Sequence, residues 1–225
     1  MILDLNPQKI KAINSLIELF EEFKVSSELN MHEHPFYIEH CNKLNDILTD
    51  LIEIKEEIKI PIDNGELYFR EHILPNGEIY EFAWSIPLLE KLIKNNGNCV
   101  VRKKFKIGEV EEFVDYDGLE MDRFSYAIRN TNPIYVIDYA PSNLSLMVDG
   151  NHRVASRYRA FNDKEMLIPG VYIPAEVHIK SMASNHQKIV FRILSNGNRI
   201  YNYLKRLNEG DKVKKPKLFI MDSFL

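Results

Sequence analysis

Five consecutive residues, Asp149-Gly150-Asn151-His152-Arg153, combine side chains that bind phosphate groups and move protons. An arginine guanidinium can grip a phosphate with two parallel hydrogen bonds, and an imidazole can donate a hydrogen bond or exchange a proton near neutral pH. Asp149 is the only anion of the five, so it is the candidate to orient His152, to hold a metal ion or to accept a proton from a substrate hydroxyl. We interpret the segment as an anion-binding turn, with a phosphate group as the favoured ligand.

The residues on either side predict a strand before this turn and a helix after it. Residues 144–148 are mostly apolar, and residues 151–161 are expected to be helical. Gly150 permits a positive φ and a close approach of the backbone to a ligand, and Asn151 or Asp149 can cap the helix. The first N–H groups of such a helix lack internal partners, and its dipole favours a negative charge. The same residues also suit any junction between a strand and a helix, so the local pattern alone leaves both interpretations open.

The rest of the chain predicts an α+β protein. The turn Pro75-Asn76-Gly77 separates two segments rich in strand-forming residues and so predicts a β-hairpin. Further apolar periodicities and turn residues divide the chain into alternating helices and strands. The predicted helices are 7–24, 37–58, 86–95, 118–130, 151–161 and 184–208, the last interrupted near Asn196-Gly197. The predicted strands are 67–74, 78–84, 99–105, 133–139, 144–148 and 173–179, with an extended segment at 107–113.

Two stretches resemble the ParB/sulfiredoxin superfamily: Asn132-Pro133-Ile134-Tyr135-Val136-Ile137-Asp138 and Leu146-Met147-Val148-Asp149-Gly150-Asn151-His152-Arg153-Val154-Ala155. Members of that superfamily have a P-I-x-V strand, a turn, a second strand and a D-G-x-H-R type of loop that opens a helix. The resemblance covers about residues 105–180. It implies a mixed-sheet core with helices in residues 99–225, preceded by a helical and β-hairpin extension in residues 1–98.

The resemblance also implies a ligand for the loop. Nucleotide phosphates would be held by Gly150, Asn151, His152 and Arg153, with ATP, ADP or CTP as the nucleotide and Mg²⁺ as a further candidate. Members of the superfamily hydrolyse CTP as a clamp switch, use ATP to repair an oxidised cysteine, or phosphorylate free serine. The chain has Asn151 where the sulfiredoxin type of loop has its reactive cysteine, which argues against the repair chemistry.

The loop is most similar to that of the free-serine kinases, in which an upstream glutamate is the base. Three upstream acids are available, and we favour Glu112 over Glu111 and Glu120 because it is expected on the extended segment that leads into the core. The candidate catalytic residues are therefore Asp149, His152 and Glu112. The expected reaction is phosphoryl transfer or nucleotide hydrolysis, although the sequence also allows a protein that is not an enzyme.

The charge distribution leaves a second interpretation open. The net charge of −4 argues against a protein that coats nucleic acid, yet lysines and arginines gather near the C-terminus. The alternative is therefore a nucleic-acid-binding protein or nuclease of a DNA-modification, plasmid or phage-defence system. ParB proteins follow the loop with a helix-turn-helix, and residues 182–208 show no such pattern. A third possibility is an interaction module that modifies a host protein or a nucleotide pool.

The remaining features predict a cytoplasmic protein that contacts no membrane. No apolar run approaches the roughly 20 residues that span a bilayer, and the N-terminus lacks the pattern of a secretory signal. Cys41 and Cys99 lie far apart and are interpreted as reduced thiols. His32, His34, His40 and Cys41 include metal-binding residue types, but Pro35 favours a plain loop there, so we expect no metal site formed by protein side chains alone.

Overall fold

The computed structural model describes residues 66–74, 76–114, 116 and 118–219, together with the single residues 14, 15, 18, 35, 38 and 39. The helices predicted at 7–24 and 37–58, and the histidines between them, therefore lie almost wholly outside the described residues. None of the helices in the described ranges is long and apolar enough to cross a membrane. The mixture of helices with a mixed sheet confirms the α+β class.

The chain forms two compact units that alternate along the sequence. The first comprises Met1–Trp84, Ala140–Ser142 and Met182–Leu225, and the second comprises Ser85–Tyr139 and Asn143–Ser181. The sequence-based boundary at residue 98 stays a prediction.

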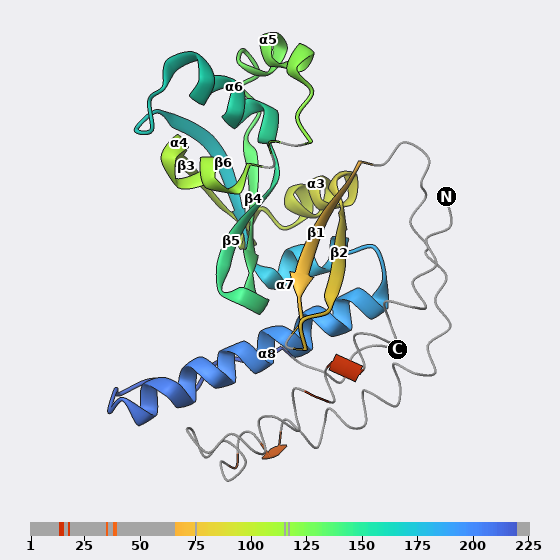
Figure 1. The fold of residues 1–225 in the computed structure, drawn as a ribbon, viewed down its shortest axis with the longest axis vertical. Helices are drawn as coiled ribbons and strands as arrows, with labels where there is room; N and C mark the ends of the chain where they lie inside the picture. The colour runs from red at the N-terminus through yellow and green to blue at the C-terminus, as the bar shows by residue number, and fades with distance from the viewer. Residues whose placement is uncertain are drawn as a thin grey trace. The chain divides into compact units, whose positions relative to one another are not determined.

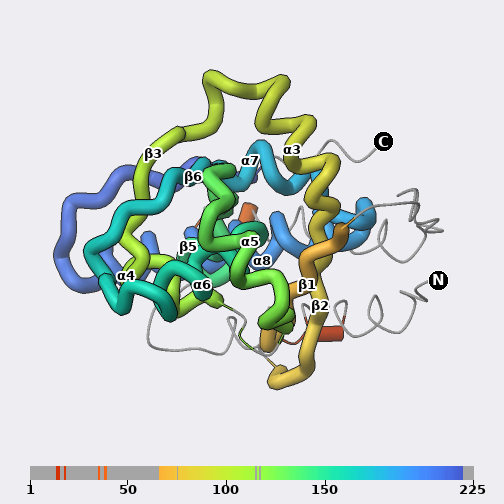
Figure 2. The backbone as a smooth tube through the Cα atoms, turned by 90° about the horizontal axis from the view of Figure 1, so that it is seen from above, coloured from red at the N-terminus to blue at the C-terminus, as the bar shows by residue number. Residues whose placement is uncertain are grey.

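The first unit contains the predicted hairpin, formed by β1 (Leu67–Ile73) and β2 (Ile79–Ser85). The hairpin packs on the long helix α8 (Asn185–Asn208), and Figure 1 and Figure 2 both show these distant parts of the sequence side by side. The Tyr80 hydroxyl is 3.1 Å from Nδ1 of His186, and Gln187 hydrogen-bonds the backbone of β2 at Glu81 and Ala83. The aromatic rings of this core come from both elements: Tyr80, Phe82, Trp84 and Phe191.

Helix α8 is continuous, so the predicted interruption near Asn196-Gly197 is wrong. Asn196 is fully buried, and its side-chain amide donates to the carbonyl of Phe219 and accepts from the Phe219 N–H. The asparagine therefore ties the C-terminal segment to the helix. The short 3₁₀ helix η5 (Ala140–Ser142) also contacts α8, and Asn198 donates a hydrogen bond to its Ala140 carbonyl.

The second unit is built on a four-stranded sheet with the order β3-β6-β4-β5. Its strands are β3 (Val101–Lys106), β4 (Ile134–Tyr139), β5 (Leu144–Asp149) and β6 (Leu167–Ile173). β4 pairs antiparallel with β5 and parallel with β6, and β3 pairs antiparallel with β6. The predicted strands at 99–105, 133–139 and 144–148 are confirmed within a few residues.

Helices cover the central strand β4 on both faces. Val154 and Ala155 of α6 (Asn151–Phe161) pack in one apolar core with Ile134 and Val136. Side chains alternate along a strand, so Tyr135 points the other way, toward α3 (Ile86–Asn95). The four-residue helix α7 (Ala175–His178) also contacts β4 and α3.

Two predicted extended segments are helical in the structure. Residues 107–113 form α4 (Ile107–Val110) and the 3₁₀ helix η3 (Glu111–Phe113), because Glu109 accepts the Lys106 N–H and so satisfies a donor at the start of the helix. The strand predicted at 173–179 ends at Ile173, and Pro174 opens helix α7 there. The predicted helix 118–130 is shorter than expected, with η4 (Met121–Arg123) and α5 (Phe124–Ala127).

Candidate functional site

The predicted loop joins β5 directly to α6, as the sequence led us to expect. Gly150 has φ 116° and ψ 5°, a left-handed conformation that favours glycine. A Cβ atom on Gly150 would overlap Cγ2 of Ile134, so the close approach that requires glycine is to Ile134 on β4. Gly150 is the N-terminal cap of α6 and no side chain caps the helix, so the expectation that Asn151 or Asp149 does so is wrong.

Asp149 pairs with Arg153 and not with His152. Nη2 of Arg153 lies 2.6 Å from Oδ2 of Asp149 and also donates to the Pro133 carbonyl at 3.1 Å. The Arg153 side chain is 12% exposed and that of Asp149 is 25% exposed, so the pair is well shielded from water. The Asp149 carboxylate therefore holds the guanidinium at the start of α6.

Donors remain at this end of α6 after those bonds are made. In the described part of the chain, the N–H groups of Asn151, His152 and Arg153 have no hydrogen-bond acceptor. Nε of Arg153 and Oδ1 of Asn151 are buried and without partners. Buried polar atoms are nearly always satisfied, so orphaned atoms beside an uncapped helix start fit a site that receives a ligand or water.

His152 contacts a segment that the sequence did not predict to lie beside the loop. The backbone N–H of Glu120 donates to Nε2 of His152 at 3.1 Å, and the Phe124 ring packs edge-on against the imidazole. Because Nε2 accepts this bond, Nδ1 is the ring nitrogen left to donate a hydrogen bond. His152 thus anchors residues 119–124 beside the loop.

The upstream acids take different positions. Glu112 lies exposed on η3, a helical segment and not the extended one we expected, and it has no hydrogen bond to the loop among the described residues. Glu111 accepts the Tyr116 hydroxyl at 2.6 Å. Glu120 is the acid whose backbone reaches the loop, while its carboxylate pairs with Arg123. Of the predicted catalytic set, the structure therefore brings Asp149 and His152 to the loop.

Two further residues near the loop were missed by sequence reasoning. The Tyr135 hydroxyl donates to Oε1 of Glu90 on α3 at 3.4 Å, and Tyr135 lies opposite Asp149 in the β4–β5 register. Burial, and then the charges of Glu90 and Asp149, raise the pKa of Tyr135, whereas Arg153 lowers it. No local motif marks Glu90, because it lies on a helix 45 residues upstream of Tyr135.

The residues present fit an anion better than a metal ion held by protein alone. Among the described residues, no group of three or more His, Cys, Asp and Glu side chains can hold a metal. Mg²⁺ usually binds through one or two carboxylates together with substrate phosphates, and Asp149 is the loop's only carboxylate for that role.

Comparisons with protein-family models, curated proteins and solved structures gave no match.

Proposed function

We propose that the chain binds a nucleotide through its phosphates at the start of α6, within a fold of the ParB/sulfiredoxin type. One observation carries the proposal: the uncapped helix start presents the N–H groups of Asn151, His152 and Arg153 beside the buried, unpartnered Nε of Arg153. Backbone donors, the helix dipole and a guanidinium then act on the same anion. The resemblance of residues 132–155 to the superfamily supports a nucleotide as that anion.

The reaction that this arrangement supports best is phosphoryl transfer or nucleotide hydrolysis. Such reactions depend on positioning and on stabilising charge that develops on the phosphoryl oxygens. Arg153 and the backbone N–H groups supply the positive charge, and Asp149 holds the guanidinium in place. His152 has its Nδ1 proton available as a donor while Nε2 accepts from Glu120. Glu112 stays a candidate base that would have to act through movement of η3 or through water.

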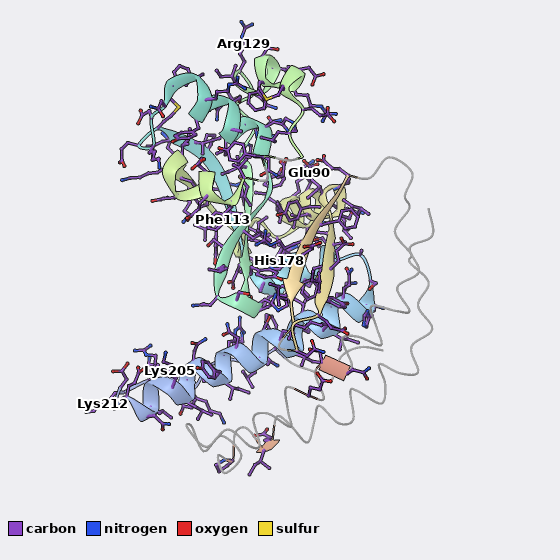
Figure 3. The ribbon with its side chains drawn as sticks, viewed as in Figure 1. Glu90, Phe113, Arg129, His178, Lys205 and Lys212 are labelled. Carbon is purple, nitrogen blue, oxygen red and sulfur yellow. The ribbon has the colours of Figure 1, made fainter. Side chains whose placement is uncertain are left out.

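The test is isothermal titration calorimetry with ATP, ADP, CTP and inorganic triphosphate, with and without Mg²⁺. Arg153→Ala is expected to weaken binding at least about tenfold, the equivalent of about 1.4 kcal/mol. Arg153→Lys keeps the positive charge but loses the paired N–H donors of the guanidinium, so this variant should bind these ligands with an intermediate affinity. Arg129→Ala is the matched control, because Arg129 is an exposed arginine of the same unit (Figure 3). If none of these ligands binds, or Arg153→Ala and Arg153→Lys bind as the parent does, the proposal is wrong.

One observation favours the alternative of nucleic-acid binding or cleavage. Exposed lysines follow one another along the C-terminal end of α8 and the segment after it: Lys205, Lys212, Lys214, Lys215 and Lys217 (Figure 3 labels the first two). Clustered lysines bind phosphate backbones in a way that weakens steeply with salt. Binding of labelled DNA or RNA at low salt, lost when Lys212, Lys214 and Lys215 are changed to Gln, would support this function. If the protein neither binds nor cleaves DNA or RNA at low salt, this alternative function is wrong.

A further inference from the structure

Three polar side chains from three elements of the second unit gather next to the loop. Glu90 comes from α3 (Figure 3), Tyr135 from β4, and Asp149 from the last position of β5. The Tyr135 hydroxyl donates to Glu90, and Tyr135 is the register partner of Asp149. The proposed nucleotide function assigns no role to Glu90 or Tyr135.

An irregularity in strand pairing brings Asp149 into this group. Val136 pairs with Met147, but the next residue, Tyr135, pairs with Asp149, so Val148 is an extra residue in β5. In a regular ladder Tyr135 would face Val148, and Asp149 would point to the opposite face of the sheet. The bulge therefore turns the carboxylate of Asp149 toward the face that carries Tyr135 and Glu90, and bulges of this kind commonly re-aim a side chain at a functional site.

The group can accept hydrogen bonds as well as donate one. Oε2 of Glu90 and Oδ1 of Asp149 have no hydrogen-bond partner in the described part of the chain, and both side chains are partly exposed, so both oxygens can accept a further hydrogen bond. Burial and the two carboxylates raise the pKa of Tyr135, so its hydroxyl keeps its proton at neutral pH. These acidic acceptors lie beside the electropositive start of α6, which gives the site a positive and a negative side.

That polarity selects a ligand with an anion at one end and hydroxyl donors at the other. We propose that Glu90 and Tyr135 bind the ribose hydroxyls of the nucleotide whose phosphates lie at the start of α6. A carboxylate is a strong acceptor for the hydroxyls of a ribose and repels phosphate, so it orients the nucleotide in one direction. This inference rests on the proposed function and adds to it the residues that distinguish a nucleotide from a bare polyphosphate.

The experiment compares three ligands on four proteins by calorimetry: ATP, 2′,3′-dideoxy-ATP and inorganic triphosphate, each with Mg²⁺. The parent is expected to bind ATP about tenfold more tightly than the dideoxy compound, since a hydrogen bond to a charged group contributes about 1.5 kcal/mol or more. Glu90→Gln and Tyr135→Phe should weaken ATP binding, abolish that preference and leave triphosphate binding unchanged. Glu176→Gln removes an exposed carboxylate of the same unit and should change nothing.

The possible results separate this inference from the function on which it rests. If the parent binds neither ATP nor triphosphate, the proposed function fails and the inference fails with it. If ATP binding depends on Arg153 but is unchanged in Glu90→Gln and Tyr135→Phe, the inference alone is wrong. Equal binding of ATP and dideoxy-ATP by the parent also overturns it, because the ribose hydroxyls then contribute nothing to the affinity. Melting curves for each variant establish that it is folded.

Discussion

Gly150 shows how one residue serves both the fold and the candidate site. Its φ of 116° turns β5 into α6, and its missing side chain makes room for Ile134. Gly150→Ala is expected to destabilise the protein by about 3 kcal/mol, from left-handed strain and overpacking together. It should also abolish triphosphate binding, because the start of α6 would have to move. Urea unfolding followed by circular dichroism measures the first effect, and calorimetry the second.

Gly197 provides the control for that substitution. It lies inside α8, and an added Cβ would meet no atom of the described residues within 4 Å. Gly197→Ala should therefore stabilise the protein by up to about 1 kcal/mol, the usual gain in helix propensity. Equal effects of the two substitutions would contradict the role given to the Gly150 conformation.

The local chemistry of the loop was readable from its residues, but its partners were not. A glycine between a predicted strand and a predicted helix indicates a positive φ, which the structure confirms at Gly150. The ion pair between Asp149, the last residue of β5, and Arg153 of α6 was not predicted. Ile134 and Glu120 reach the loop through the fold, and Glu90 reaches its neighbour Tyr135, but no pattern near these residues in the sequence shows it. The bulge in β5 depends on the pairing of β5 with β4, so the direction of the Asp149 side chain could not be predicted from the sequence either.

At the scale of elements, His152 joins α6 to the segment 119–124. His152→Ala removes the acceptor for the Glu120 N–H and the ring against which Phe124 packs. The Glu120 amide should then exchange its hydrogen faster, whereas amides in the middle of β4 should be unaffected. Hydrogen exchange measured by NMR checks this expectation. An unchanged rate at Glu120 would show that the bond does not hold the segment.

Arg159→Ala is the control variant for the contact between α6 and residues 119–124. Arg159 lies on α6 and its guanidinium reaches the sulfur of Met121, so it touches the segment at a residue other than Glu120. We expect this weaker, exposed contact to change Glu120 exchange much less than His152→Ala does.

The sequence predicted the helices and strands that their own residues favour. It missed those that depend on contacts with residues far away in the sequence. The helices at 86–95 and 151–161 match their predictions, and the β4–β5 pair was expected from its apolar runs. β6 was missed because Pro169 and Gly170 usually interrupt strands. The Phe105 ring lies where a Cβ on Gly170 would be, a close approach that only the folded sheet reveals.

Asn196, in the first unit, is another residue whose local structure depends on a contact with a distant residue. An asparagine before a glycine indicates a break in a helix, yet here the amide is buried and pairs with both backbone groups of Phe219. Asn196→Ala should lower the free energy of unfolding by about 2–3 kcal/mol, because it leaves those two groups without partners. It should also speed proteolysis within residues 211–219. Asn202→Ala is the control, since the amide of Asn202 is exposed and, among the described residues, bonds only Asn198 of the same helix.

For the whole molecule, the two units have one electrostatic property in common: each contains a histidine that folding keeps neutral. Burial lowers the pKa of His178 in the second unit to about 4, against the opposing effect of its hydrogen bond to the Asp138 carbonyl. Burial, followed by the charge of Arg70, lowers the pKa of His72 in the first unit to about 4. An unfolded histidine has a pKa of about 6.5, so the unfolded chain binds more protons between these values.

Stability should therefore rise with pH across this window. The stabilising effect of each neutral histidine is complete above about pH 6.5 and is lost as the pH falls toward 4, with an upper limit of about 3 kcal/mol per residue. Carboxylates also titrate below about pH 5, so the informative measurement is the difference between the parent and a variant. The slope of unfolding free energy against pH should decrease in His178→Gln and in His72→Gln, and decrease further in the double variant. A slope that is the same in all four proteins would mean that neither histidine is protonated on unfolding in this range, which would contradict their burial.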